Sequence, residues 1–131
     1  MAMIERLMLD GQPAPVSHYC HVTKAGGLIW VSGTVGMAAD GSVPDGVVEQ
    51  FELAIANMDA CLKAVGARAE HVVKVTVYLT DVADRAKINP IRQRYFGEHR
   101  PASTLVEVSA LVLPGLKVEI EAQAVLGLGG R

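Results

Sequence analysis

The 131-residue chain contains no apolar run close to the ~20 residues that a membrane-spanning helix needs. It also lacks a run of lysine and arginine, and its net charge of −2 offers no basic surface to a nucleic acid or an anionic membrane. Its first residues do not show the ordered basic and apolar regions of a signal peptide, so we expect a cytoplasmic protein. The sequence has no internal repeat, low-complexity segment or linker, which predicts one domain over residues 1–131.

Cysteine is scarce, and Cys20 and Cys61 fall in different expected elements, so reduced thiols are the preferred interpretation. The run His18-Tyr19-Cys20-His21 has metal-ligand residue types, but in a strand His18 and Cys20 share a face that His21 opposes. No second Cys/His cluster completes such a site, so we expect no metal and no cofactor. Cys20 is a less favoured nucleophile, because only His18 is an obvious base.

Two helices and six strands are expected from the spacing of apolar residues. Apolar side chains step by three or four from Val47 to Val65, which predicts an amphipathic helix ended by Gly66. Asn89-Pro90 fits the cap and first residue of a second helix that runs to Phe96. A helical turn capped by Asp81 is expected before it. The expected strands are residues 4–8, 19–24, 28–32, 72–80, 104–111 and 117–125, and residues 127–131 are expected to fray.

Two helices can cover only one face of such a sheet, so the other face meets water or another subunit. In the last strand, Val118 and Ile120 are predicted to take one side and Glu119 and Glu121 the other. In the fourth strand, one side is expected to hold Val73, Val75, Val77 and Leu79, and the other Val72, Lys74, Thr76 and Tyr78. This second face is too apolar for bulk water and suits an oligomer interface with a polar site set into it.

Four ordered sequence blocks precede the segment Leu116-Lys117-Val118-Glu119-Ile120-Glu121-Ala122. They lie at residues 14–21, 28–35 and 72–81, and the fourth joins residues 88–89 with 95–102. Together they resemble the RidA/YjgF reactive-intermediate deaminase family, small trimeric proteins that hydrolyse enamines and imines. The resemblance covers about Pro13 to Ala124. It implies a chorismate-mutase-like α+β fold, a single domain with a mixed sheet and two helices on one face. Three such subunits would close their sheets into a barrel, with a cleft at each interface.

The same resemblance implies the site residues. In deaminating relatives an arginine of a Pro-Ala-Arg block binds the substrate carboxylate, and a glutamate of a Glu-Ile-Glu-Ala block holds the attacking water. A tyrosine, a Ser-Gly backbone and an asparagine line the pocket. The matching positions here are Tyr19, Gly33, Asn89, Ser103 and Glu119. Ser103 departs from the pattern, because a hydroxyl is one uncharged donor where a guanidinium has five donors and a charge.

Two hypotheses follow. In the first, the chain is a Rid-family hydrolase acting on the C–N bond of a small imine or enamine, with Glu119 as the catalytic residue. Because Ser103 lacks charge, the substrate is then not the usual 2-imino acid, or it binds in another pose. Rescue by Arg100 is not favoured, because that side chain would aim elsewhere. In the second hypothesis, the chain is a non-catalytic trimer that binds a small metabolite or an apolar protein surface.

We also expect a homotrimer without nucleic-acid or membrane partners. The acidic balance argues against the endoribonuclease activity attached to some relatives of the RidA/YjgF family. Glu119 is expected in the cleft between subunits, within reach of Tyr19 from a neighbouring chain.

Overall fold

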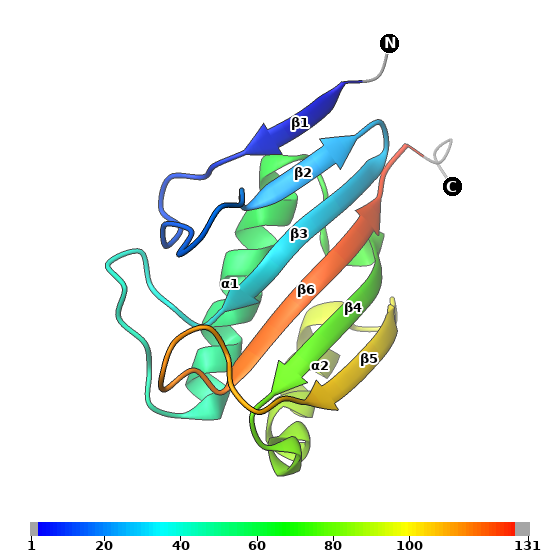
Figure 1. Cartoon of the computed structure of the whole chain (residues 1–131). Coiled ribbons are helices and arrows are strands. Elements are labelled where there is room, and N and C mark those ends of the chain that lie inside the picture. The colour runs from blue at the N-terminus through cyan, green and yellow to red at the C-terminus, as the bar shows by residue number, and fades with distance from the viewer. Residues whose placement is uncertain (1–2, 128–131) are drawn as a thin grey trace.

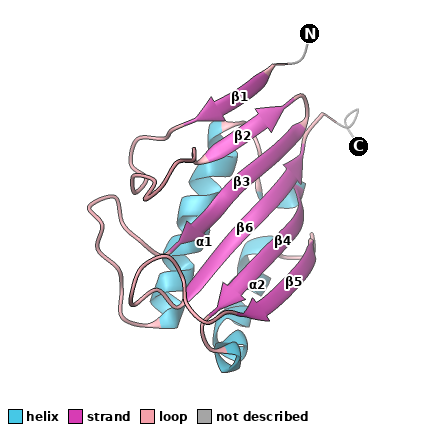
Figure 2. Ribbon diagram, viewed as in Figure 1, coloured by secondary structure: helices cyan, strands magenta, loops and turns pink. Residues whose placement is uncertain are grey.

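A computed structural model describes residues 3–127 and folds them into one sheet with two helices on a single face (Figure 1). The sheet has six strands in the order β1-β2-β3-β6-β4-β5. Strands β4 and β5 pair in parallel, while the other neighbours pair antiparallel. Figure 2 shows both helices on the same side of the strands, with the opposite face of the sheet uncovered. The predicted α+β class, mixed sheet and single helical layer are confirmed, and residues 128–131 of the expected frayed tail lie outside the described residues.

Strands β1 (Ile4–Leu7), β2 (Val22–Ala25) and β3 (Leu28–Val35) form an antiparallel meander at one edge of the sheet. The turn between β2 and β3 contains Gly26 at φ 59°, a left-handed conformation that glycine adopts at no steric cost. The strand predicted over residues 19–24 begins only at β2, so residues 19–21 belong to the preceding loop. The predicted alternation of the histidines and cysteine across a strand is therefore wrong.

Helix α1 (Val47–Ala64) confirms the predicted amphipathic helix. Its apolar stripe lies against the sheet, and Phe51, Met58 and Leu62 have no exposed surface. Gly66 follows at φ 84°, the left-handed conformation expected after a helix C-terminus. The buried stripe is thus core, and it fixes α1 across β3 and β6.

A buried amide ties two loops together beside α1. Gln50 is fully buried, and its side chain donates hydrogen bonds to Pro44 O at 2.8 Å and Gly115 O at 2.9 Å. Its carbonyl oxygen accepts from Lys117 N at 2.8 Å. Because every polar atom of this side chain has a partner, its burial costs little. The contacts hold the segment that leads into β6, the strand that carries Glu119.

Helix α2 (Arg85–Phe96) begins earlier than predicted. The Asp81 side chain accepts a hydrogen bond from Ala83 N at 2.9 Å, so the predicted capped turn is confirmed as the 3-10 helix η2 (Val82–Asp84). The chain then passes directly from η2 into α2. The two predicted pieces are therefore one continuous helical segment.

Asn89 and Pro90 consequently lie inside α2, and the prediction that they start the helix is wrong. Proline within a helix costs about 3 kcal/mol, since it has no N–H and crowds the carbonyl one turn back. The longer helix places Ile88 in the core with no exposed surface. Burial of such a side chain stabilises by about 1.5–3 kcal/mol, which offsets the cost of the proline.

The 3-10 helix η1 (Ala69–His71) leads into β4 (Val72–Leu79), which pairs with β6 (Val118–Val125). A β-bulge interrupts this pairing between Val72 and Lys74. It turns Val72 into the core and Val73 outward, the reverse of the predicted sides for these two residues. From Val75 onward the predicted alternation holds, because the register beyond the bulge is regular.

Strand β5 (Ala102–Glu107) lies at the edge of the sheet and ends earlier than the predicted residues 104–111. Its partner β4 ends at Leu79, and the last contact between them is the hydrogen bond from Val108 N to Leu79 O at 2.8 Å. Beyond that point the chain has no strand to pair with, which explains the earlier end.

The face of the sheet opposite the helices carries both charged and apolar side chains. In β6, Val118 and Ile120 are fully buried toward the helices, while Glu119 and Glu121 take the other side, as predicted. Trp30 on β3 is 41 % exposed, which is high for so large a ring. Among residues 3–127, no helix has the length and apolar character needed to cross a membrane.

Candidate active site

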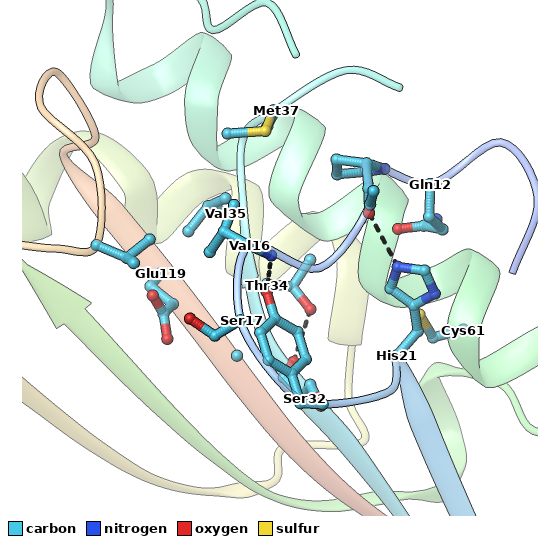
Figure 3. A pocket seen from close by; sticks show the side chains of 15 residues that line it. Gln12, Val16, Ser17, His21, Ser32, Thr34, Val35, Met37, Cys61 and Glu119 are labelled. Atoms are coloured by element: carbon cyan, nitrogen blue, oxygen red, sulfur yellow. Dashed lines mark hydrogen bonds between the residues drawn. The ribbon is translucent and has the colours of Figure 1, made fainter. Parts of the chain in front are cut away.

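A cavity of about 280 Å³ opens where the loop before β2 crosses the end of β3 and the start of β6 (Figure 3). Figure 3 shows Glu119 on one side of the cavity and His21 with Gln12 on the other. Val16, Val35, Met37 and Val112 provide apolar wall, and Ser17, Tyr19, Ser32, Gly33 and Thr34 provide further lining. The cavity therefore combines one carboxylate with small hydroxyl groups and apolar surface.

A β-bulge in β3 places Gly33 beneath Glu119. The register of β3 against β6 shifts by one residue at this point. Two regular pairs flank the bulge: Val31 with Ala122, and Thr34 with Ile120. A Cβ atom on Gly33 would lie 3.0 Å from Glu119 Cδ and closer still to its Oε2. The φ angle of Gly33 is not in the left-handed region, so other residues could adopt this backbone conformation. Glycine is needed here because any side chain would collide with the Glu119 carboxylate.

Two causes raise the pKa of Glu119. Burial of its half-exposed carboxyl group is the larger cause, and the charge of Glu121 on the same face of β6 is the second. Both effects disfavour the ionised form, so this carboxyl group takes up a proton more readily than an ordinary surface glutamate. A carboxyl group with a raised pKa, set in a cavity, is suited to take a proton from water and return it.

Tyr19 lies in the loop before β2 and lines the same cavity as Glu119. Its hydroxyl oxygen accepts a hydrogen bond from Val16 N at 3.4 Å, which closes a short turn of the loop. Tyr19 and Glu119 of one chain thus line one cavity, whereas the tyrosine near Glu119 was predicted to come from a neighbouring chain.

The histidine and cysteines near the cavity have structural partners. His21 Nδ1 accepts from Leu9 N at 2.9 Å, so its Nε2 carries the proton and donates to Pro13 O at 2.9 Å. Burial raises the pKa of Cys61 to about 11, which disfavours a thiolate there. Cys20 and Cys61 are both free thiols. Within the described part of the chain, no three His, Cys, Asp or Glu side chains are grouped to hold a metal ion.

Asn89 and Ser103, the remaining predicted site residues, do not line this cavity. Asn89 is exposed on α2, and Ser103 is exposed on the edge strand β5. Ser103 instead accepts a hydrogen bond from Arg92 Nη2 at 2.6 Å. Arg92 was not among the predicted site residues. The residues of α2 include several cations and no carboxylate, which is a signal in the sequence that could have indicated it.

Comparisons with known proteins extend over nearly the whole chain. The family model described as endoribonuclease L-PSP matches residues 10–126. A RutC family protein of Pyrococcus abyssi is 39% identical over 122 residues, covering 92% of this chain and 95% of that protein. A 2-iminobutanoate/2-iminopropanoate deaminase of Capra hircus is 39% identical over 129 residues, covering 96% of this chain and 93% of that protein. The crystal structure of the YjgF gene product from E. coli is similar with a TM-score of 0.85 at 32% identity, covering 92% and 98%.

Proposed function

Because this chain belongs to the RidA/YjgF family, whose family model is described as endoribonuclease L-PSP, we propose that it hydrolyses the C=N bond of a small imine. An enamine would react through its imine tautomer. The relatives named as 2-iminobutanoate/2-iminopropanoate deaminases support a deaminase role. The observation on which the proposal rests is the Glu119 carboxyl group, held over Gly33 in a cavity that suits a small metabolite.

Glu119 would act as both base and acid in this reaction. Its carboxylate takes a proton from a bound water as the water oxygen adds to the imine carbon. The same carboxylic acid then returns the proton to nitrogen, which gives a carbinolamine. The carboxylate next takes the hydroxyl proton of the carbinolamine and passes it to nitrogen as the C–N bond breaks, so that a carbonyl forms and ammonia leaves. One imine and one water thus give one carbonyl compound and one ammonia, with no oxidant or reductant. The raised pKa of Glu119 supports this role, because the group must gain and lose a proton in each turnover.

The bulged part of β3 would form the floor of this site. Gly33 has no side chain, so a ligand and the Glu119 carboxylate can both approach the strand closely. The Ser32 hydroxyl is already used, since it donates to Cys20 O at 2.6 Å and holds the loop that carries Tyr19. Tyr19 is therefore positioned by contacts from the same β3 segment, as a substrate-binding residue requires.

We further propose that the active form is a homotrimer with the site at each interface. The uncovered sheet face supports this assembly, because Trp30 and Tyr78 lie in it beside polar groups such as Lys74. Asn89 and Ser103 lie away from the cavity that Glu119 and Gly33 share, so they would complete a site only from a neighbouring subunit. Since Ser103 is uncharged, we propose that the substrate is not the usual 2-imino acid.

The second candidate is a trimer that binds a small metabolite without turning it over. The apolar part of the cavity wall, which includes Met37 and Val112, is the observation that favours it. Cleavage of RNA is less compatible with the cavity, because its lining residues include no lysine or arginine to bind a phosphodiester.

The Glu119→Gln variant separates the enzyme from the binding protein. Glutamine keeps the shape of the side chain but cannot accept the proton, so we expect hydrolysis to fall by at least about 100-fold while ligand binding persists. Ammonia release from a panel of imines generated in situ is the measurement. Unchanged hydrolysis in the variant would contradict the proposed role of Glu119. Hydrolysis of none of the imines by the wild-type protein would favour the binding protein.

A further inference from the structure

An arginine from α2 reaches the edge strand of the sheet. Ser103 pairs with Val75, whose side chain is buried beneath the helices, so the Ser103 side chain also faces the helical layer. Arg92 on α2 is half-buried, and its Nη2 donates a hydrogen bond to Ser103 Oγ at 2.6 Å. The short distance means that the guanidinium lies directly at the surface of β5.

The Arg92 guanidinium has N–H donors that no protein acceptor among residues 3–127 uses. It offers five N–H groups in a fixed fork, and within residues 3–127 the serine hydroxyl is its hydrogen-bond partner and no carboxylate lies within 4.0 Å. Arg94, on the same helix, is instead paired with Glu52 at 3.4 Å. Burial lowers the pKa of Arg92, which shows that its charge has lost part of its hydration. A bound anion would restore that lost stabilisation.

The surroundings of Arg92 favour an anion. Helix α2 carries four cations and no carboxylate among its 12 residues, in a chain whose net charge is −2: Arg85, Lys87, Arg92 and Arg94. Ion pairs to Asp84 and Glu52 engage two of these cations. The helix itself is therefore positively charged, and such a charge favours the approach of an anion.

Ser103 accepts a hydrogen bond from Arg92 and can also donate one of its own. Its oxygen accepts from Arg92, so its own hydrogen remains available to donate. The O–H of Ser103 and the remaining N–H groups of Arg92 then form adjacent donors, one neutral and the others charged. Such a group matches the two oxygens of a carboxylate.

We propose that Arg92, oriented by Ser103, binds a carboxylate group of the substrate. The inference rests on the proposed function and names its substrate class as imines and enamines that carry a carboxylate. Ser103 is a positioning residue here, whereas Arg92 touches the substrate. The guanidinium that a strand arginine would supply from position 103 comes instead from α2.

The position of the guanidinium also restricts the shape of the substrate. An arginine at position 103 would carry its guanidinium outward from β5 on a (CH₂)₃ stem. The guanidinium of Arg92 lies back against the short Ser103 side chain. We therefore expect the substrate carboxylate, held across the proposed cleft from Glu119, to lie farther from the reacting carbon than the carboxylate of a 2-imino acid does.

Calorimetric titration with stable carbonyl analogues tests this site without requiring turnover. The probes are 2-oxobutanoate, 4-oxopentanoate, whose carboxylate is farther from the carbonyl carbon, and uncharged pentan-2-one. We expect the wild-type protein to bind 4-oxopentanoate most tightly. Arg92→Ala should weaken that binding at least about tenfold, to the level of pentan-2-one, because a charged hydrogen-bonded partner is lost. Arg92→Lys, which keeps the charge but loses the fork, should fall between the two.

Matched variants control for charge and for orientation. Arg94→Ala removes the same charge from the same helix and should change 4-oxopentanoate binding less than twofold. Ser103→Ala should weaken binding several-fold and should also weaken the preference for 4-oxopentanoate over pentan-2-one, a change that a general loss of stability would not produce. Circular dichroism of each variant verifies that it is folded, and Arg92→Lys provides the comparison if Arg92→Ala does not fold.

Unchanged 4-oxopentanoate binding in both Arg92 variants would overturn the site. Equal losses of 4-oxopentanoate affinity in Arg92→Ala and Arg94→Ala would overturn a specific Arg92 site and leave only general charge attraction. Tighter binding of 2-oxobutanoate than of 4-oxopentanoate would overturn the inferred spacing between carboxylate and reacting carbon. The outcome is separable from that of the proposed function, because Glu119→Gln should retain 4-oxopentanoate binding. If Glu119→Gln left hydrolysis unchanged, the catalytic proposal would fail while the titrations still decided the role of Arg92.

Discussion

Replacing Gly33 with alanine tests whether the position of the Glu119 carboxylate sets the rate. The added methyl group would lie 3.0 Å from Glu119 Cδ, 3.5 Å from Cγ and closest to Oε2. Heavy atoms in ordinary contact are separated by about 4 Å, so the carboxylate must move away by on the order of 1 Å. The backbone is expected to stay in place, because alanine can adopt the φ angle of Gly33, which lies outside the left-handed region.

The expected loss can be estimated from that displacement. A reacting group misplaced by about 1 Å costs about 100-fold in rate. This factor corresponds to about 2.7 kcal/mol of transition-state stabilisation. Stability should change by less than about 1 kcal/mol, because alanine in an unstrained backbone restricts the unfolded chain, which offsets the moved side chain. Gly33→Ala is therefore expected to lower kcat/KM for imine hydrolysis about 100-fold in a protein that melts close to the wild type.

Gly46→Ala is the matched control. A methyl group on Gly46, the N-cap of α1, would also collide with a glutamate side chain, that of Glu49, with Cδ at 3.2 Å. Glu49 is exposed, and neither residue lines the cavity, so kcat/KM should stay within about threefold of the wild type. Ammonia release under kcat/KM conditions and thermal unfolding of both variants are the measurements. Wild-type kcat/KM in Gly33→Ala, or equal losses in both variants, would refute the importance of the Glu119 position.

Three further expectations concern stability, assembly and substrate. The raised pKa of Glu119 means that the folded state holds this proton more tightly, so its contribution to stability falls as pH rises from the unfolded pKa through the folded one. Glu119→Gln should therefore melt at or above the wild-type temperature at pH 7, with the difference vanishing near pH 4; a lower melting temperature at pH 7 would contradict this. Light scattering should give the mass of three chains at micromolar concentration, and a stable monomer would rule out the trimer. Turnover of 2-iminopropanoate and 2-iminobutanoate should be much slower than in an arginine-bearing relative, because Ser103 is uncharged; equal rates would contradict this reasoning.

Most of the fold could be predicted because its elements have strong local patterns. The three- and four-residue steps of α1 and the alternation in β6 each indicate the buried side without knowledge of any partner. Two errors came from tertiary contacts that override local signals. Burial of Ile88 allows α2 to continue through Pro90, and a bulge exchanges the sides of Val72 and Val73. A register shift between strands has no signature in the sequence of one strand alone.

For the candidate site, the sequence by itself determined the family and the type of residue at each candidate position. The tertiary structure alone decided how those residues meet. It placed Glu119 over Gly33 through a bulge in β3, and it joined Arg92 of α2 to Ser103 of β5. The physical reason is that periodicity reports which face a side chain takes, whereas contacts between side chains depend on strand register and on how a helix crosses the sheet.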